Sequence, residues 1–590
     1  MPALCRTRTA LCRTRTALAC SVLALLPLGG AALAAEPAAP AGSTLDAAEA
    51  PARCAALREA RHAAAGLPAL VVNDAQWRPE GTPHAVPGFG GPPQTRKLPA
   101  HCEVLASSAE RTAADGQRYA IHLRLRLPLA WNGRFLYQGG GGSNGVVGDA
   151  LSGSGLDQGY AVLAQDSGHD NARNNDPQRN QELVFGFDPQ ARADYGHASL
   201  KPTAEAGLAW VERFYGKAAK HRYFSGCSKG GQEGMAFAQR YPEVFDGIVA
   251  AAPGFALPKA ALAEMWDTQQ FGRLVADPAT GRVELGKLAT AFTGPQLKAV
   301  RAAILEACDA DDGLADGIVG DLRRCTPAKV RARLVPRTCP GGADCLSPAQ
   351  IEALSASLQG PRNKSGQALY STWFWPSGID DAGWRIWKIG GEGGMPPALN
   401  VLLGSRAMAS VFSTPPVALP PGPQGGLDYA MAFDFERDAP AIHTVAAPFT
   451  RSPWQDVGMR DPNLSAFQRR GGKLIVPHGE SDPVFSLADT LAWFDEANTL
   501  AKGRAAEFVR VFPVPGMAHC GGGPATDEYD ALAAVVRWVE QGQAPDRIEA
   551  RAGARSPWPG RTRPLCPHPL VARYVGQGDP ERSESFACKP

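Results

Sequence analysis

Two cysteines stand next to two residues that together could form a hydrolytic site. Cys227 precedes Ser228 in the sequence G-C-S-K-G, and Cys520 follows His519 in the sequence M-A-H-C. If Ser228 is a nucleophile and His519 is its base, their side chains must approach to about 3 Å. The flanking cysteines would then lie within the Cα separation of about 4.4–6.8 Å that a disulfide requires. The fold must therefore bring together two segments that are far apart in the sequence.

The serine lies in a pattern that is typical of a nucleophile elbow. The motif G-x-S-x-G is a weak signal by itself, because ordinary turns also match it. Here residues 222–225 predict a short buried strand and residues 230–240 predict a helix, with small residues where the two must pack closely. The sharp turn between them would expose the serine oxygen and direct the backbone N–H of Lys229 at a developing oxyanion.

A carboxylate is expected between the serine and the histidine, since α/β-hydrolases carry these residues in the order Ser, Asp or Glu, His. A predicted apolar strand runs into a polar loop that contains Glu480 and Asp482. We expect Asp482 to be the acid because a Ser-Asp-Pro turn fixes its position, and Glu480 is the alternative. His169 and His478 could serve as bases by residue type, but neither adjoins a cysteine and neither follows Asp482 in the chain.

A glycine run is a candidate for the rest of an oxyanion hole. Residues 134–138 predict a strand, and the glycines at 139–142 follow it directly. Such a run is often a flexible turn, but it also lets backbone N–H groups approach a substrate without obstruction by a Cβ atom. We expect Gly142 to provide the second oxyanion donor, beside Lys229.

The order of the predicted elements indicates the α/β class: an α/β-hydrolase core, with a doubly wound and mostly parallel sheet, that carries a large inserted lid domain. Residues 245–254 predict a core strand, the next clear core strand begins only at Gly471, and the segment between is rich in Pro, Gly and Trp. We therefore predict a catalytic domain over 35–256 and 440–590 and a lid over 257–439. The formal net charge of +2 argues against nucleic acid as the main partner.

The N-terminal residues 1–34 are typical of a signal peptide. Arginines precede an apolar run from Ala17 to Leu33, and the run ends at a small-residue cleavage site. A Pro-Leu-Gly-Gly break leaves this run shorter than the roughly 20 residues of a membrane span. We expect a secreted or periplasmic protein without a membrane span. Removing the leader takes three of the 13 cysteines, and the even number that remains predicts disulfides rather than zinc sites, because no C-x-x-C pair occurs.

The combination Cys-Ser, then Asp, then His-Cys resembles the hallmark of the tannase and feruloyl esterase family, in which a disulfide joins the two cysteines. The resemblance extends over nearly the whole mature chain, through residues 131–135, 168–171, 193–196, 214–216, 246–250, 515–517 and 563–567. It implies a carboxylic-ester hydrolase in which Ser228 is the nucleophile, His519 is the base and Asp482 orients the histidine. The disulfides that it implies are Cys54–Cys102, Cys227–Cys520, Cys308–Cys325, Cys339–Cys345 and Cys566–Cys588.

An acidic loop over residues 308–318 is a candidate calcium site. It crowds four carboxylates and two glycines into one short segment, and calcium prefers carboxylate and carbonyl oxygens. From the spacing alone, a solvated acidic turn with Asx-type hydrogen bonds is the alternative. The resemblance implies a structural Ca²⁺ ion in the lid, bound by side-chain oxygens of Asp309, Asp312 and Asp316 and by carbonyl oxygens of Leu314 and Ile318.

Two aromatic residues are candidates for the walls of a substrate site. By the resemblance, Phe485 contacts the aryl ring of a substrate and Trp387 is a lid residue beside it, whereas ordinary packing is the alternative for each. In the branch of the family that hydrolyses mono(2-hydroxyethyl) terephthalate (MHET), a lid arginine binds the free carboxylate of the substrate. Leu399 occupies the corresponding position here, which argues against that substrate unless Arg406 or Lys388 replaces the arginine.

Three functions are open from the sequence. The leading hypothesis is an exported serine hydrolase of small aromatic esters, with hydroxycinnamoyl, galloyl or terephthaloyl acyl groups, that acts through an acyl-enzyme. The second is a true MHET hydrolase that uses another lid cation. The third is a non-catalytic binding protein on a hydrolase fold, against which the intact Ser228, Asp482 and His519 argue. The chemistry requires no redox or organic cofactor, and the sequence leaves the oligomeric state open.

Overall fold

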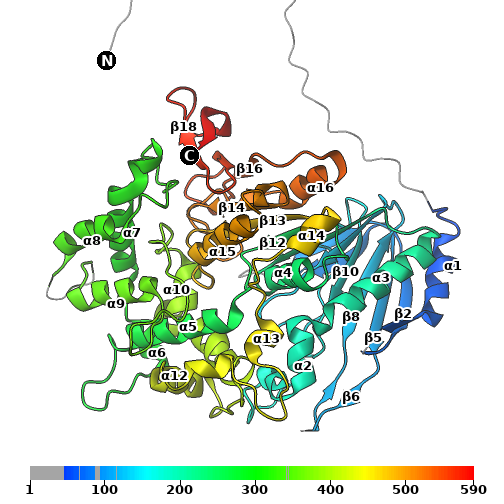
Figure 1. Ribbon diagram of the computed structural model, residues 1–590, viewed down its shortest axis with the longest axis horizontal. Coiled ribbons are helices and arrows are strands. Elements are labelled where there is room, and N and C mark those ends of the chain that lie inside the picture. The colour runs from blue at the N-terminus through cyan, green and yellow to red at the C-terminus, as the bar shows by residue number, and fades with distance from the viewer. Residues whose placement is uncertain (1–44, 65–66, 87–93, 115, 340–341, 343) are drawn as a thin grey trace, which may run out of the picture. The chain divides into compact units, whose positions relative to one another are not determined.

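A ten-stranded mixed sheet forms the centre of the protein in a computed structural model that describes residues 45–590 except 65–66, 87–93, 115, 340–341 and 343 (Figure 1). The strands follow the order β1-β2-β5-β8-β10-β9-β11-β12-β13-β14. They are β1 (Arg61–Ala64), β2 (Leu67–Arg78), β5 (His101–Ser108), β8 (His122–Pro128), β9 (Arg134–Gln138), β10 (Ala161–Gln165), β11 (His221–Cys227), β12 (Gly247–Ala251), β13 (Lys473–Gly479) and β14 (Val509–Val514).

The two halves of this sheet differ in direction. The strands from β10 to β14 all pair in parallel, as expected for a doubly wound core. The strands β1, β2, β5, β8 and β10 pair antiparallel. The predicted parallel core is therefore present, and a large antiparallel extension that we did not predict continues it at one edge.

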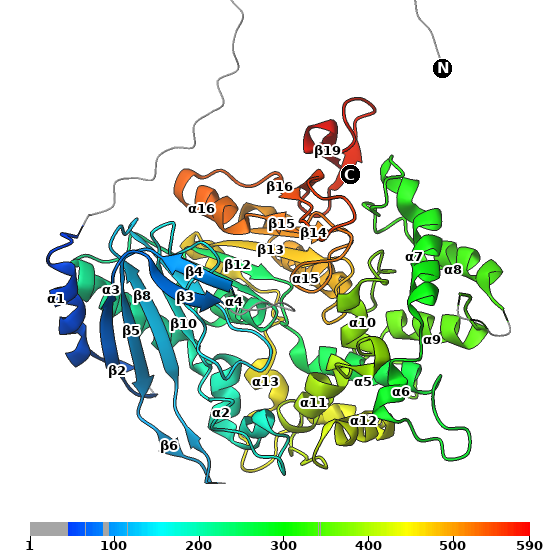
Figure 2. The ribbon, with the colours of Figure 1, turned by 180° about the vertical axis from the view of Figure 1, so that it is seen from behind.

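Helices cover both faces of the parallel half, because its strands are apolar on both sides. Successive residues of β11 illustrate this: Phe224 belongs to the same core cluster as Met235 of α4 (Lys229–Arg240), and Tyr223 belongs to a second cluster with Val535 of α16 (Ala531–Gln541). Helices α3 (Leu200–Tyr215), α4 (Lys229–Arg240) and α15 (Leu487–Leu500) contribute to the first cluster, and α16 (Ala531–Gln541) contributes to the second. In Figure 1, α3 and α4 lie in front of the strands, and in Figure 2 they lie behind them.

The strand order places a topological switch point at β9. The chain leaves β9 for β10 on one side and then crosses to β11 on the other side. In open α/β sheets, ligands bind outside the carboxyl ends of the strands at such a point. The loop after β9 is the glycine run, and the turn after β11 carries Ser228, so both lie at this position.

The segment between β12 and β13 contributes no strand to the large sheet in the described part of the chain. Most of its helices occupy the green side of Figures 1 and 2, whereas the last helix, α14 (Ser465–Arg470), lies beside α4 of the core in Figure 1. They are α5 (Leu257–Gly272), α6 (Leu285–Leu288), α7 (Gly294–Cys308), α8 (Pro327–Leu334), α9 (Pro348–Gln359), α10 (Ala382–Lys388), α11 (Arg406–Ser410), α12 (Pro423–Ala432), α13 (Pro453–Val457) and α14 (Ser465–Arg470). The lid limits 257–439 stay a prediction, although α5 begins at Leu257.

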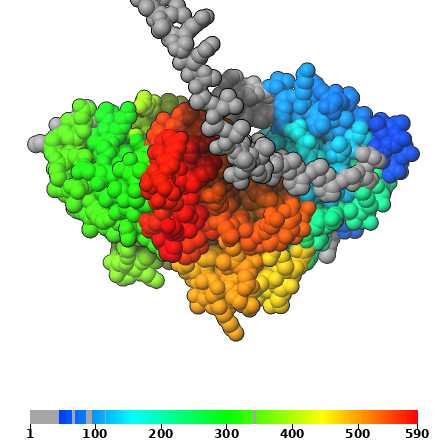
Figure 3. Space-filling view, turned by 90° about the horizontal axis from the view of Figure 1, so that it is seen from above, coloured from blue at the N-terminus to red at the C-terminus, as the bar shows by residue number. Residues whose placement is uncertain are grey.

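The C-terminal segment lies against the inserted helices. Figure 3 shows it in red beside their green surface. Small sheets are formed by β15 (Glu528–Tyr529), β16 (Ile548–Arg551) and β17 (Thr562–Leu565), and by β18 (Val571–Tyr574) and β19 (Phe586–Lys589). Ion pairs cross this contact: Arg563 pairs with Asp316, and the guanidinium of Arg573 lies 2.6 Å from Asp321.

Five disulfides cross-link the part of the chain that the structure describes, and they join the five pairs of cysteines that the resemblance implied. The predicted signal peptide, residues 1–34, lies outside the described residues. None of the helices in the described ranges is both long enough and apolar enough to cross a membrane.

Candidate active site

Ser228 occupies a strained turn between β11 and α4. Its backbone dihedrals, φ 64° and ψ −120°, lie in a region that non-glycine residues rarely adopt. The N–H of Ser228 donates to the carbonyl of Ala251 at 3.1 Å, and its own carbonyl accepts from the N–H of Gly254 at 3.0 Å. A Cβ atom at Gly226 would lie 2.7 Å from the carbonyl carbon of Gly230, so the strand and the helix can approach this closely only through glycines. The predicted elbow is therefore present.

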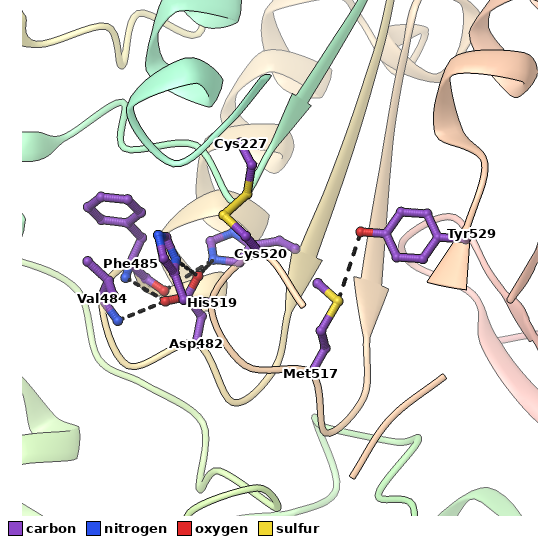
Figure 4. Close-up of a disulfide and its surroundings, with 9 residues drawn as sticks. Cys227, Asp482, Val484, Phe485, Met517, His519, Cys520 and Tyr529 are labelled. Carbon is purple, nitrogen blue, oxygen red and sulfur yellow. Dashed lines mark hydrogen bonds and ion pairs between the residues drawn. A yellow bond between two sulfur atoms is a disulfide. The ribbon is translucent and has the colours of Figure 1, made fainter. Parts of the chain in front are cut away.

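The carboxylate of Asp482 lies beside His519 (Figure 4). The two are joined by a 2.8 Å hydrogen bond between Nδ1 of His519 and Oδ2 of Asp482. The other carboxylate oxygen accepts from the N–H groups of Val484 at 2.7 Å and Phe485 at 3.1 Å. Burial alone would raise the pKa of Asp482, but the charge of His519 and the hydrogen bonds from His478 and His519 outweigh it and hold that pKa below its usual range. Asp482 therefore stays ionised and fixes the ring of His519.

A disulfide ties the serine turn to the histidine loop. Cys227 and Cys520 are bonded, with their Cα atoms 6.0 Å apart, as Figure 4 shows beside Asp482 and His519. Ser228 and His519 form no direct hydrogen bond in the described part of the chain. Such contacts are often long in ligand-free sites and tighten when substrate binds. The bridge thus limits how far the two residues can separate.

The glycine loop after β9 is held by buried polar groups of α4. Glu233 accepts from the N–H of Gly140 at 3.0 Å and from the amide of Asn144 at 2.7 Å. It also accepts from Nζ of Lys229 at 2.9 Å, and both of these side chains are 1% exposed. The hydroxyl of Tyr195 donates to the carbonyl of Gly142 at 3.4 Å. Loop residues 140, 142 and 144 are therefore fixed relative to the serine turn.

The two expected oxyanion donors line one pocket together with Ser228. Lys229 is the first residue of α4, and the leading N–H groups of a helix have no partner within it. Gly142 has a positive φ of 59°, which glycine adopts without steric cost. Gly142 and Lys229 therefore share the pocket of Ser228, and their role as oxyanion donors stays a prediction.

The pocket has a volume of about 600 Å³, part of it open to solvent, and its walls are mainly apolar. Phe485 and Trp387 both line it. Their rings also meet His519 edge-on, with ring centroids 5.4 and 5.7 Å from that of the imidazole. The two predicted aromatic residues are thus brought together beside the histidine, from a core loop and from helix α10.

Comparison with known proteins agrees with this geometry. The chain matches the tannase and feruloyl esterase family over residues 102–589. It is 41% identical over 551 residues to the mono(2-hydroxyethyl) terephthalate hydrolase of Piscinibacter sakaiensis, covering 88% of each chain. It is 30% identical over 484 residues to a probable feruloyl esterase of Arthroderma benhamiae, covering 80% of this chain and 82% of that protein. The chain belongs to the tannase and feruloyl esterase family. The predicted enzyme class, a carboxylic-ester hydrolase, is thereby confirmed.

Crystal structures of Aspergillus oryzae proteins of similar fold support the assignment of the architecture. An esterase superimposes with a TM-score of 0.72 at 24% identity, covering 92% of this chain and 100% of that one. Feruloyl esterase B superimposes with a TM-score of 0.70 at 23% identity, covering 91% and 100%. At this identity the likeness shows the fold alone, and it confirms the predicted α/β-hydrolase class.

Glu480, our alternative acid, has other partners in this member of the family. Its carboxylate accepts from the N–H and the hydroxyl of Ser377 at 3.0 and 2.9 Å, and from the hydroxyl of Ser481 at 2.8 Å. The N–H of Gly516 donates to it at 3.0 Å. Since Ser377 belongs to the insertion, Glu480 joins that segment to the core, whereas Asp482 contacts His519.

The two other candidate histidines are buried, and the contacts of their rings are not those of a catalytic base. Nδ1 of His478 lies 2.9 Å from the hydroxyl of Thr490 and Nε2 lies 3.1 Å from the carbonyl of Phe485. His169 stacks on Phe185 with ring centroids 4.0 Å apart, and burial lowers its pKa to about 4. Both are therefore placed as structural residues.

Neither of the alternative lid cations lines the pocket, whose walls all lie in the described part of the chain. Lys388 is buried and forms an ion pair with Asp267. Arg406 donates to the side chain of Gln181. Leu399 also lies outside the pocket, and the segment that contains it reaches the pocket through Leu403 instead.

The acidic loop presents carboxylate and carbonyl oxygens, the donors that calcium prefers. Asp309 accepts from the N–H of Gly317 at 2.9 Å, and Asp312 accepts from the N–H of Gly320 at 2.9 Å. Burial, opposed by these hydrogen bonds and reinforced by the neighbouring carboxylates, raises the pKa of Asp312 to about 7. As the side chains stand, no group of three or more His, Cys, Asp or Glu residues in the described ranges is arranged around a metal position. Asp316 pairs with Arg563 instead.

Two acids of the site were not found from the sequence. Glu233 follows the serine by five residues, which gave no signal because two of its partners, Gly140 and Asn144, come from a different loop. Glu264 lines the pocket from α5 at 7% exposure. Its signal was present, since it is a charged residue on an otherwise apolar helix face, but only the fold shows which surface that face covers.

Proposed function

We propose that this protein is an exported serine carboxylic-ester hydrolase that acts on small aromatic esters through an acyl-enzyme. One observation carries the proposal: the strained Ser228 turn is covalently joined, through Cys227–Cys520, to the loop whose histidine is bound by Asp482. Family membership supports the ester-hydrolase class. Export is supported by five disulfides, since such bonds persist in oxidising compartments.

The geometry supports the following sequence of steps. Because Asp482 holds the proton of His519 on Nδ1, Nε2 is free to take the proton of Ser228. The serine oxygen attacks the ester carbonyl, and the N–H groups of Gly142 and Lys229 stabilise the oxyanion. His519 then gives its proton to the leaving alcohol, and the acyl group stays on Ser228. Water repeats the sequence, releases the acid and restores the serine.

The acyl group is proposed to be aromatic because the pocket is apolar and has Phe485 and Trp387 among its walls. Hydroxycinnamoyl, galloyl and terephthaloyl groups are all flat enough for such a site. A hydrolysis of this kind requires no redox or organic cofactor. The proposed partner is thus a small aromatic ester.

Replacement of the nucleophile tests the proposal. Ser228→Ala should lower kcat on a chromogenic aryl ester by about 10³-fold or more, since removing one member of a catalytic unit disables the whole unit. The variant should keep the melting temperature of the wild type, because the backbone of the turn and the Cys227–Cys520 bond are unchanged. Near-normal turnover in a preparation free of other esterases would overturn the assignment.

Hydrolysis of MHET is the second candidate. It is supported by the 41% identity to a protein named as an MHET hydrolase. The contacts of Lys388 and Arg406 speak against it, since both cations are engaged elsewhere. Initial rates on methyl ferulate, methyl gallate and MHET separate the candidates: a kcat/KM for MHET above the other two would favour the second.

A further inference from the structure

One acidic side chain interrupts the apolar wall of the pocket. Helix α5 lines the pocket with Leu257, Ala260, Ala261 and Glu264. This spacing of three and four residues places all four on one face of the helix. Among the pocket's walls, which lie wholly in the described part of the protein, Glu264 is the only residue with a carboxyl group.

The carboxyl group of Glu264 has no hydrogen-bond partner within the described residues, although the side chain is only 7% exposed. Lys388, the cation whose charge acts on Glu264, is bound to Asp267, one turn further along α5. Asp267 in turn accepts a hydrogen bond of 2.6 Å from the hydroxyl of Ser357. Lys388 is therefore neutralised by another acid, and Glu264 is left without a counter-ion of its own.

Burial raises the pKa of Glu264 to about 8, opposed by the charge of Lys388 and reinforced by that of Asp267. At neutral pH the group is therefore mainly an uncharged carboxylic acid. In that form it can both donate and accept a hydrogen bond. A buried polar group without a partner is costly, and a ligand that pairs with it removes that cost.

The surroundings show that the carboxyl group faces the pocket. Gly404 lines the same pocket, and a Cβ atom built there would collide with Oε2 of Glu264. The glycine therefore leaves the space that the carboxyl group occupies. Burial raises the pKa of the hydroxyl of Tyr195, another pocket residue, and Glu264, when ionised, adds to this effect.

The length of α5 relates Glu264 to the nucleophile. The helix begins three residues after Gly254, whose N–H is bound to the carbonyl of Ser228. Glu264 lies seven residues beyond Leu257, and a helix rises about 1.5 Å per residue, so it is about 10 Å further along the axis. A hydroxycinnamoyl group, with a vinyl spacer and a ring between its carbonyl and its ring hydroxyl, is the longest of the three candidate acyl groups.

We propose that Glu264 is a specificity-determining residue that binds the ring hydroxyl of a hydroxycinnamoyl substrate and excludes a ring carboxylate. This inference rests on the proposed function, because it places the ester carbonyl at Ser228. A phenolic hydroxyl satisfies the buried acid as donor and acceptor. A ring carboxylate brings a negative charge into an apolar part of the pocket, where it meets a neutral acid instead of a cation, and one hydrogen bond from that acid does not repay the desolvation of the charge.

Two pairs of esters test the proposal. Methyl 4-hydroxycinnamate and methyl cinnamate differ only in the ring hydroxyl, and dimethyl and monomethyl terephthalate differ in the ring carboxylate. The wild type should prefer the first member of each pair by about tenfold or more in kcat/KM. Glu264→Leu should abolish the hydroxyl preference and leave methyl cinnamate nearly unchanged. Glu264→Gln, which is isosteric and also both donates and accepts a hydrogen bond, should keep both preferences. Glu284→Gln, at an exposed lid position, is the matched control.

Two results would overturn the proposal: a wild-type hydroxyl preference that persists in Glu264→Leu, or a wild-type preference for monomethyl over dimethyl terephthalate. If Glu264→Leu does not fold, Glu264→Ala takes its place in the comparison of methyl 4-hydroxycinnamate with methyl cinnamate. Hydrolysis of 4-nitrophenyl acetate, whose acyl group is too short to reach Glu264, should be equal in all these proteins and lost in Ser228→Ala. If the wild type fails to hydrolyse that ester, the proposed function is contradicted. If Glu264→Leu keeps both the acetate turnover and the hydroxyl preference of the wild type, only the role of Glu264 is contradicted.

Discussion

A buried glutamate on the elbow helix connects the nucleophile to the glycine loop. Glu233 binds Lys229, next to the serine, and it also binds Gly140 and Asn144. Burial lowers the pKa of Lys229, and the charge of Glu233 opposes this. Lys229 and Glu233 therefore form a buried salt bridge. Removing one partner of such a pair is strongly destabilising, because the other partner is left as an unpaired buried charge. At this position it also fixes the loop that carries the proposed oxyanion donor Gly142.

Glu233→Gln should lower kcat by about 10–100-fold while changing KM little. The new amide would direct its N–H group at side-chain and backbone donors that now bind the carboxylate of Glu233, and the glycine loop would shift. A shift of about 1 Å would weaken the contact between the proposed donor Gly142 and the oxyanion of the transition state. Steady-state kinetics well below the melting temperature are the measurement, and Glu212→Gln on the exposed face of α3 is the control. A raised KM with unchanged kcat would contradict this role, because the loop that Glu233 fixes carries the proposed oxyanion donor, which acts on the chemical step.

Sequence patterns located elements well where the signal was local. The strand predicted over 134–138 is β9 (Arg134–Gln138), and the helix predicted over 230–240 is α4 (Lys229–Arg240). The antiparallel pairing of β1, β2, β5 and β8 was not predicted, because strand partners are chosen by contacts across the sheet. For the same reason Ser228, Asp482 and His519 could be proposed from their motifs, whereas Glu233 and Glu264 depend on surfaces that only the fold creates.

The disulfide between the elbow and the histidine loop should affect catalysis as well as stability. Replacing Cys227 and Cys520 by Ala should lower kcat by about 10²-fold, since small positional errors are costly, and lower stability by about 2–5 kcal/mol. Replacing Cys566 and Cys588, which are bonded in the C-terminal segment, should lower stability but leave kcat unchanged. Equal kcat in both double variants would reject the positioning role, and free thiols at 227 and 520 in unreduced peptides would reject the bridge.

On the scale of the whole molecule, the acidic loop lies where the insertion meets the C-terminal segment. Arg561 donates to the carbonyl of Asp316 at 2.8 Å, and Arg563 pairs with the carboxylate of the same residue. Arg573 reaches Asp321 further along. The conformation of the acidic loop therefore affects the contact between the insertion and the C-terminal segment. A calcium ion bound in the loop would stabilise that contact.

Calcium should raise the melting temperature, and a chelator should lower it, because an ion that binds only the folded state stabilises it by mass action. The variant Asp312→Asn should lose most of this response, whereas Asp311→Asn, in the same loop but outside the proposed ligands, should keep it. Turnover of small esters at low temperature should not change. Thermal unfolding in calcium and in chelator is the measurement; a wild type that responds to neither, or an Asp312→Asn variant that responds fully, would contradict the site.

The Cys227–Cys520 bond spans a sequence separation of 293 residues, and the inserted segment lies inside that interval. A protease that cuts one loop of the insertion would leave the serine and the histidine on different polypeptides. The bond would still join those two polypeptides beside the reacting groups. A single cut would therefore yield one covalently linked, two-chain protein rather than two fragments, and the connection between nucleophile and base does not depend on an unbroken backbone through the insertion.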